Sequence, residues 1–381
     1  MKTMTKLSLV AGLALASCTS ASAYDLKGAF ENAKVSGEMK VMYFDETQTS
    51  TKDDQITAIG GKLSFETGKV EGLYGKLTFQ TSHILDYSNS AANIFKKDMD
   101  ASGSVLSESY LGYKMNDNFA KIGRQFIKTP LVAGSGSRMI KDSFEAILAG
   151  TTVANTTIVA GHVSKYANRT DQAGAPGKFI EIENGKDGAI TLYAENKSVE
   201  NLKIRAQYAV LQDDKDLSIM YTDAAYKLGD TKLSVQYGIS DNDANTDKGT
   251  LLGLKIDQKI DALTLSAAYN TAGDKEDYES GLGEGAHYAF TKLSVGSGKN
   301  AYKATADSMM IQAAYKMGDL KLAAAHAKYE TDTTDYTEQE VSAKYKFSKQ
   351  SYLAASYTTF GGAGNETRYD TETRLTLGYK F

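Results

Sequence analysis

The stretch AAYKLGDTKL at Ala224–Leu233 returns almost unchanged as AAYKMGDLKL at Ala313–Leu322. In each copy a Gly-Asp pair separates two segments in which apolar and polar residues alternate. After the first pair, Leu233, Val235 and Tyr237 alternate with Lys, Ser and Gln. This period of two is typical of a β-strand with one apolar and one polar face. Glycine readily takes the positive φ of a two-residue hairpin turn. The repeat therefore predicts two similar β-hairpins.

The hairpins are separated by long polar stretches at their other ends, such as residues 241–250 and 273–308. Short turns at one rim and long loops at the other are typical of a transmembrane β-barrel. The only two prolines, Pro130 and Pro176, lie in stretches that read as loops. Because proline cannot donate to a sheet ladder, this distribution favours sheet throughout the chain. The predicted fold is all-β, an antiparallel transmembrane barrel over residues 24–381.

Alternation predicts 18 strands, the first at residues 34–45 and the last at 371–381. An even number returns both chain ends to the same rim. A barrel of 16 strands is the alternative, if two weak strands of the first half belong to loops. For two strands the alternation does not decide which side chains face the lumen and which face lipid. Over 119–126, an inward Lys121 leaves Arg124 outward unless Gly123 marks a bulge. Over 320–330, His326 would face lipid and Tyr329 the lumen.

Tyrosines mark the strand ends on the short-turn side. A tyrosine ring can lie in the bilayer edge while its hydroxyl reaches the headgroup water. Tyr113, Tyr226, Tyr315, Tyr345 and Tyr379 fit such a girdle, although tyrosine is also a good strand former in soluble sheets. The chain ends TRLTLGYKF, in which Tyr379 and Phe381 share the apolar face. A terminal Phe on an amphipathic last strand resembles the signal read by the outer-membrane barrel-assembly machinery.

The N-terminus reads as a secretory signal peptide over residues 1–23. Lys2 and Lys6 precede an apolar run, and Ala21-Ser22-Ala23 is a small-residue cleavage site. The alternative is a lipoprotein leader with Cys18 as the lipidated residue. Either leader directs the chain out of the cytoplasm, and with the barrel pattern it predicts the outer membrane of a Gram-negative bacterium.

Composition excludes several other classes of protein. Cys18 is the only cysteine, so the mature chain has no disulfide framework and no thiolate metal site. Removing Lys2 and Lys6 from 43 basic residues leaves 41 against 47 acidic ones, a net charge near −6. Nucleic-acid binding would need a basic face, and we expect none. The four histidines and the serines show no catalytic spacing, so we expect no enzyme. A surface adhesin or structural barrel, binding through its long loops, remains an alternative.

The polar face of the strands is rich in Lys and Arg. A Lys or Arg facing lipid at the midplane would cost about 2–4 kcal/mol, so these residues are expected to face inward. A barrel of 16 to 18 strands encloses an aqueous channel, which predicts the passage of small hydrophilic solutes and ions. The predicted lining residues are Lys62, Lys76, Lys203, Arg205, Lys232, Lys344 and Arg374.

Residues 127–142 form the predicted third outer loop. In wide porins a loop at this position folds inward and narrows the lumen. We therefore expect Arg138, Lys141 and Asp142, together with Glu145 just beyond the loop, to project into a constriction. Opposed charges there would orient dipolar solutes, and charges of one sign would select ions.

Several motifs in and around this loop resemble the OprD-type outer-membrane porins. They are GRQ at 123–125, TPL at 129–131, SRM at 137–139 and SFEA at 143–146, together with KVSGEMKVMYF at 34–44. The resemblance is clearest over residues 24–170. It implies an 18-stranded channel for small nutrients, including amino acids and carboxylates, with relatives that prefer cations. Lys141 stands where many members have proline, and lysines outnumber arginines in the predicted lumen.

Acidic residues gather in two outer loops, at Asp274, Glu276, Asp277, Glu279 and Glu284, and at Asp241, Asp243 and Asp247. They would enrich cations at the mouth or form a weak Ca²⁺ site; no other cofactor is expected. The expected partners are outer-membrane lipids, the assembly machinery, the permeating solutes and, by analogy with general porins, two further copies in a homotrimer.

Overall fold

The computed structural model describes residues 23–47, 54–88, 95–182, 188–212, 217–243, 245–286, 288–293, 298–362 and 370–381. The predicted signal peptide, apart from Ala23, lies outside the described residues. A short helix, α2 (Ala23–Glu31), precedes the first strand. No helix among the described residues is long and apolar enough to cross a membrane.

The described residues form 19 strands. Their bounds are β1 (Lys34–Thr47), β2 (Asp54–Glu66), β3 (Leu73–Tyr87), β4 (Gly103–Met115), β5 (Asn118–Gln125), β6 (Ser143–Val153), β7 (Thr156–Ala167), β8 (Phe179–Glu181), β9 (Gly188–Asn196), β10 (Leu202–Gln212), β11 (Leu217–Leu228), β12 (Thr231–Asp241), β13 (Gly249–Ile260), β14 (Leu263–Ala272), β15 (Asp307–Met317), β16 (Leu320–Glu330), β17 (Asp335–Lys346), β18 (Ser351–Gly361) and β19 (Thr371–Lys380). Two short 3-10 helices, η1 (Phe95–Lys97) and η2 (Lys299–Tyr302), lie in loops.

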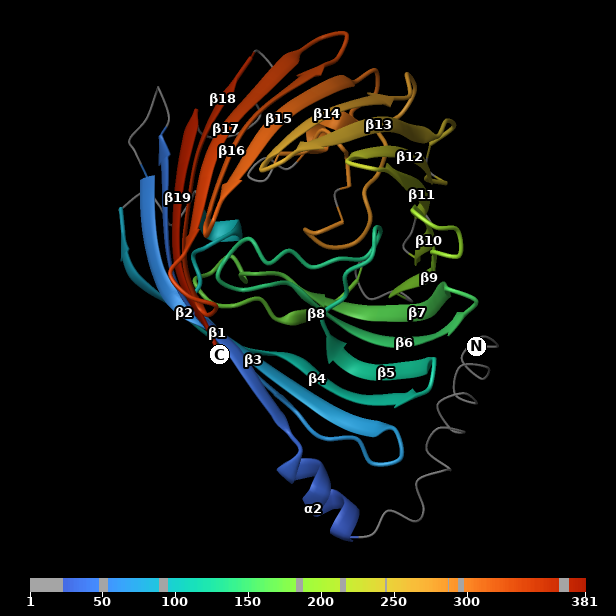
Figure 1. Cartoon of the computed structure of the whole chain (residues 1–381), viewed down its shortest axis with the longest axis vertical. Coiled ribbons are helices and arrows are strands. Elements are labelled where there is room, and N and C mark those ends of the chain that lie inside the picture. The colour runs from blue at the N-terminus through green and yellow to red at the C-terminus, as the bar shows by residue number, and fades with distance from the viewer. Residues whose placement is uncertain are drawn as a thin grey trace.

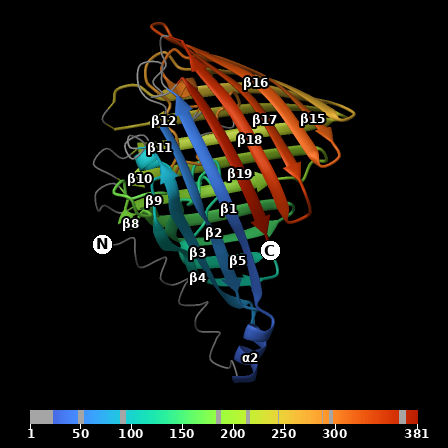
Figure 2. The same ribbon diagram turned by 90° about the vertical axis from the view of Figure 1, so that its left-hand side faces the viewer.

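All strands except β8 close into one antiparallel barrel of 18 strands. Each barrel strand pairs with the next, β7 pairs directly with β9, and β1 pairs with β19 to close the ring (Figure 1). The strands run obliquely past one another, as the side view shows (Figure 2). The predicted 18 strands are confirmed, and the alternative of 16 is wrong. The additional strand β8 pairs with the end of β7; its three residues are too few to show periodicity.

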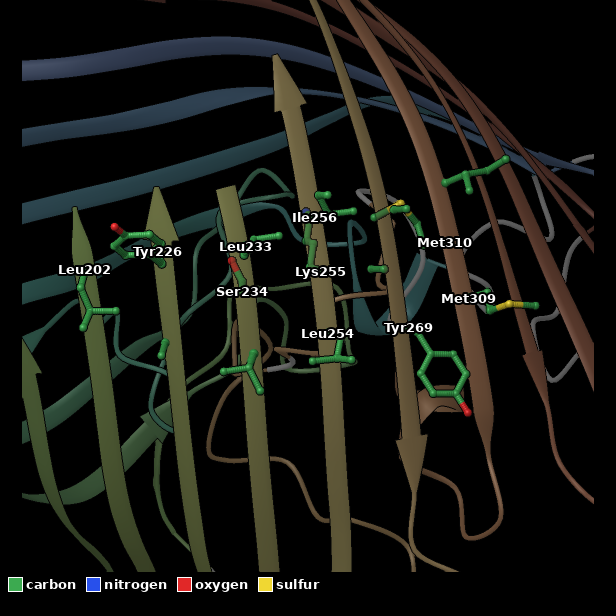
Figure 3. Close-up of a pocket in the computed structure, with 15 residues that line it drawn as sticks. Leu202, Tyr226, Leu233, Ser234, Leu254, Lys255, Ile256, Tyr269, Met309 and Met310 are labelled. Atoms are coloured by element: carbon green, nitrogen blue, oxygen red, sulfur yellow. The ribbon is translucent and has the colours of Figure 1, made fainter. Parts of the chain in front are cut away.

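The two faces of the barrel differ as the alternation predicts. Val235 is 41 % exposed on the outer face, whereas its neighbour Gln236 is fully buried inside. Because directly opposed residues of adjacent strands share a face, the apolar outer surface continues from strand to strand. On β10–β15 it contains a shallow groove of about 640 Å³, in which Leu233, Leu254 and Tyr269 project from neighbouring strands (Figure 3).

The hairpin turns adopt the expected conformation. Gly229 has φ 58° and Gly318 has φ 56°, each between strands paired up to the turn. Tyr226, Tyr315 and Tyr379 lie near this rim, and each is more than two-fifths exposed, so the girdle forms on the outer face. We call this the short-turn rim and the opposite end the long-loop rim.

The terminal Phe381 closes the seam between β1 and β19. Its backbone N–H donates to the Gly37 carbonyl at 3.2 Å, and the Gly37 N–H donates to the Phe381 carbonyl at 2.9 Å. The phenyl ring lies over Gly37 so closely that a Cβ there would be 2.4 Å from its Cζ. Tyr379 stacks beside it, with ring centroids 6.1 Å apart.

The strand register shows which side chains face inward on the two strands for which the sequence did not decide this. Gly123 is paired regularly with Tyr110, so no bulge occurs and Arg124 lies on the outer face. Tyr329 is buried on the inner face, and His326 is on the outer face opposite Ile311.

Candidate functional site

Several connections of the long-loop rim turn into the barrel, where Figure 1 shows green and orange coil inside the ring of strands. The constriction loop, residues 127–142, joins β5 to β6. The 273–306 loop joins β14 to β15 and packs on the inner wall through Tyr278, Leu293 and Tyr302. Because these side chains form one buried cluster with Leu131 and Val132, the two loops fill part of the bore together.

The constriction loop reaches across to a distant strand. The Leu131 N–H donates to Gln207 Oε1 on β10 at 2.7 Å, and Gln207 Nε2 donates to Thr129 Oγ1 at 2.9 Å. Beside this anchor the Leu282 N–H donates to the Leu131 carbonyl at 2.8 Å. The Ala133 N–H donates in turn to the Leu282 carbonyl at 3.0 Å. The loop is therefore fixed to β10, four strands along the ring from β5, and to the 273–306 loop.

The other end of the constriction loop is held by β1 and β3. Gln80 accepts from the Lys141 N–H at 3.0 Å and donates to the Lys141 carbonyl at 2.8 Å. Lys40 Nζ donates to the Arg138 carbonyl at 2.9 Å. These contacts leave the Lys141 ammonium directed at the Phe126 ring, 4.6 Å from its centre. Burial and the nearby charge of Lys62 lower the pKa of Lys141.

An ionic cluster joins three inward loops. Asp98, which follows η1, accepts from Arg138 Nη2 at 3.2 Å and from Arg169 Nη1 at 2.5 Å. Arg169 Nε also lies 3.5 Å from Asp142 Oδ1. Burial raises the pKa of Asp142 to about 6 against the opposing charge of Arg169. Arg138 and Arg374 lie on the Phe44 ring, at 5.1 and 5.0 Å from its centre.

Two of the four residues predicted at the constriction, Arg138 and Asp142, belong to this cluster, and both are buried in it. Lys141 lies next to Asp142 in the loop but is directed at Phe126. The prediction for Glu145 is wrong. Its strand begins at Ser143, and pairing places Glu145 opposite Arg124 on the outer face, 3.6 Å from that guanidinium. Asp98 and Arg169 were missed, because nothing in the sequence shows which loops meet.

The seven predicted lining residues all lie on the inner face, although most have a partner. The ion pairs are Lys76–Glu108 at 3.2 Å, Arg205–Asp223 at 3.0 Å, Lys232–Asp257 at 3.4 Å and Arg374–Glu372 at 2.9 Å. Lys344 Nζ lies 4.4 Å from the centre of the Tyr352 ring. Lys62 is directly opposite Glu38 of β1 and Gln80 of β3, and Lys203 is directly opposite Ala225 of β11. The inner wall is therefore mixed in charge.

A row of acidic residues crosses the inner wall near the long-loop rim. Glu340, Thr358, Glu372, Glu46 and Asp54 are directly opposed in turn across β17, β18, β19, β1 and β2. All five are buried, and within the described chain Glu46 Oε2 and Thr358 Oγ1 lack hydrogen-bond partners. We call this the acidic row. Period-two alternation predicts that each residue faces inward, but only the register aligns them.

Each acidic outer loop contains an ion pair of its own, and a hydrogen bond joins the two loops. Lys248 pairs with Asp241 at 2.6 Å, Lys303 with Asp277 at 3.6 Å, and Asn245 Nδ2 donates to Glu276 at 3.0 Å. In the part of the chain that the structure describes, no group of acidic, His or Cys side chains has the arrangement of a metal site. The expected weak Ca²⁺ site has no support there.

No protein-family model and no curated protein sequence matches the chain. Solved structures match it in fold. OccAB1 of Acinetobacter baumannii is 16 % identical, over 93 % of this chain and 98 % of its own, with a TM-score of 0.77. OccK3 (OpdO) of Pseudomonas aeruginosa is 14 % identical over 93 % and 97 %, with the same TM-score. The outer membrane protein OpdK of P. aeruginosa is 15 % identical over 93 % and 100 %, at 0.74. The chain therefore has the fold of these 18-stranded OprD-family barrels.

Proposed function

We propose that the protein is an outer-membrane porin of a Gram-negative bacterium, through which small hydrophilic solutes and ions diffuse passively. The observation that carries the proposal is the closed barrel of 18 strands, apolar outside and charged inside. A barrel of this size encloses water, and its outer surface suits the acyl chains of a bilayer.

The inward loops favour a narrowed, solute-selective channel over an adhesin. The constriction loop and the 273–306 loop pack inside the barrel, whereas an adhesin would present its long loops to the outside. Lys141 is partly exposed on the constriction loop, and the buried Arg138 and Asp142 of the same loop add charges of both signs to the local electric field. Such a constriction orients a solute that carries separated charges, as amino acids do.

Single-channel recording in a planar bilayer tests the proposal. The purified protein should give stepwise currents, and a salt gradient should give a reversal potential set by the constriction charges. A solute-selective channel should show small steps that its solute blocks. Folded, inserted protein that passes no current would contradict the proposal and favour a structural barrel.

A further inference from the structure

A second cavity, of about 470 Å³, opens at the long-loop rim between the 273–306 loop and residues 331–334, which join β16 to β17. Its walls include Asp277, Asn300, Lys303, Thr331 and Asp332, and Tyr329 and Tyr336 also line it. Arg138, Lys141 and Asp142 do not line it, so the cavity is separate from the constriction. Its volume is typical of a site for a small ligand.

The cavity is fixed on both sides by hydrogen bonds. Asp277 Oδ1 accepts from the Ala304 N–H at 2.7 Å, which shapes the wall formed by the 273–306 loop. The Asp332 N–H donates to Thr305 Oγ1 at 3.2 Å, which joins the two walls. Tyr329 donates to the Thr291 carbonyl at 3.1 Å and packs on Tyr336, with ring centroids 5.7 Å apart. The site therefore exists before any ligand arrives.

The lining combines hydrogen-bond donors and acceptors, among them the ion pair of Lys303 and Asp277 at 3.6 Å. The carboxylates of Asp277 and Asp332 only accept, the Lys303 ammonium only donates, and Asn300 and the threonine hydroxyls do both. A ligand anion would face two carboxylates, and a ligand cation would face Lys303. The best match is a neutral molecule with several closely spaced hydroxyl groups, each able to donate to a carboxylate and accept from an amide, ammonium or hydroxyl group.

We propose that this cavity binds a saccharide at the mouth of the barrel. The sugar can come from the medium or from the oligosaccharide part of a lipopolysaccharide, because both present the same hydroxyl chemistry. Saccharide binding here does not depend on whether the barrel conducts. An experiment can therefore refute the binding site without refuting the porin function, and the reverse.

Saturation-transfer NMR on the purified full chain, in a detergent without a sugar headgroup, tests the site. Free monosaccharides and disaccharides are titrated in one arm. The other arm compares lipopolysaccharide that has a complete core with a deep-rough form that lacks it. The variant Asp332→Ala removes a carboxylate but keeps the backbone N–H that bonds Thr305. We expect at least about tenfold weaker sugar binding, the loss typical of a hydrogen bond to a charged group.

Asp274→Ala is the matched control, because Asp274 is exposed in the same loop but does not line the cavity. It should bind sugar as the wild type does, and Thr334→Val should weaken binding as a second cavity variant. Single-channel conductance of Asp332→Ala should be unchanged. Sugar binding in either arm that is weakened only by the cavity variants supports the proposal. No binding in both arms, or equal binding by wild type and both cavity variants, overturns it.

Discussion

Asp98 is the residue at which three of the inward loops meet. It accepts hydrogen bonds from Arg138 and Arg169, which come from two other loops and are only 7 % and 6 % exposed. Burial alone would raise the pKa of Asp98, but the two guanidinium groups hold it below its usual value. Because a buried charge without a partner is costly, one carboxylate fixes the positions of two arginines.

The variant Asp98→Asn should increase single-channel conductance and current noise. The amide keeps the size of the side chain but removes the charge that balances Arg138 and Arg169, so their loops should leave the lumen part of the time. The local arrangement should lose about 1–3 kcal/mol. Asp100→Asn, two residues away, is the control. Conductance equal to the wild type in both variants would show that Asp98 does not position the loops.

Asp142 should make ion selectivity depend on pH. Its pKa is about 6, so the carboxylate balances Arg169 above that pH and is neutral below it. Acidification therefore makes the constriction more positive by one charge, and the reversal potential should shift towards anions between pH 7 and 5. In Asp142→Asn the constriction already lacks this negative charge at pH 7, so the part of the shift due to Asp142 should vanish. A full shift in that variant would assign the titration to another group.

The strands are the elements that sequence alone predicts well. Alternation identifies β12 and β15, for example, because one face of each strand is turned to the loops and water inside the barrel and the other is turned to lipid. It fails where the apolar residues of a strand, and not the polar ones, face inward. Glu145 was expected to face inward because it is charged, but Phe144 and Ala146 take the inner face of β6, where they pack in the buried cluster with the inward loops. The acidic row and the Asp98 cluster depend on register and on loop packing, which the local pattern does not contain.

The acidic row should oppose the stability of the barrel. Carboxylates directly opposite one another on adjacent strands repel, and neighbouring strands are only about 4.8 Å apart. Replacing Glu46 by Gln removes repulsion with Glu372 and Asp54, so we expect a gain of up to about 1 kcal/mol rather than a loss. The temperature at which the folded band disappears on a semi-native gel measures this. A lower temperature for Glu46→Gln would mean that its charge has a stabilising partner.

The seam between β1 and β19 should be sensitive to side-chain size at Gly37. A valine there would overlap the Phe381 ring, which must then leave the seam, and its Cβ would also lie 2.7 Å from the Lys62 carbonyl, so that β2 must shift as well. We expect Gly37→Val to lower the unfolding temperature and to slow assembly, as removal of Phe381 itself would do. Gly28→Val, where nothing lies near the added atoms, is the matched control. Assembly at the wild-type rate in Gly37→Val would show that this contact is not needed.

At the scale of the whole molecule, we expect the inward loops, and not the barrel wall, to set the size limit of the proposed channel. The 273–306 loop enters and leaves the lumen at one place, because the Tyr278 N–H donates to the Tyr302 carbonyl at 2.8 Å. The same loop contacts Leu131 and Ala133 of the constriction loop through Leu282 and Gly285. It therefore both fills space and supports the narrowing.

Replacing residues 279–301 by a short Gly-Ser linker should enlarge the channel severalfold in conductance. The linker can be short because Tyr278 and Tyr302 are already hydrogen-bonded. Semi-native gels check that the variant still folds, and exclusion of polyethylene glycols of graded size measures the passage. An unchanged size limit in the folded variant would place the narrowest point elsewhere.

The hydrogen bonds between Gly37 and Phe381 bring the beginning and the end of the barrel to one point. A peptide bridge across the seam could join them, and the chain could then be reopened at another hairpin, for instance between Gly229 and Asp230. Such a circular permutant would keep every strand pair and change only the order in which the strands are synthesised. Comparing the assembly rate of the permutant with that of the wild type would show how much of assembly depends on the order in which the strands are synthesised and how much on strand pairing alone.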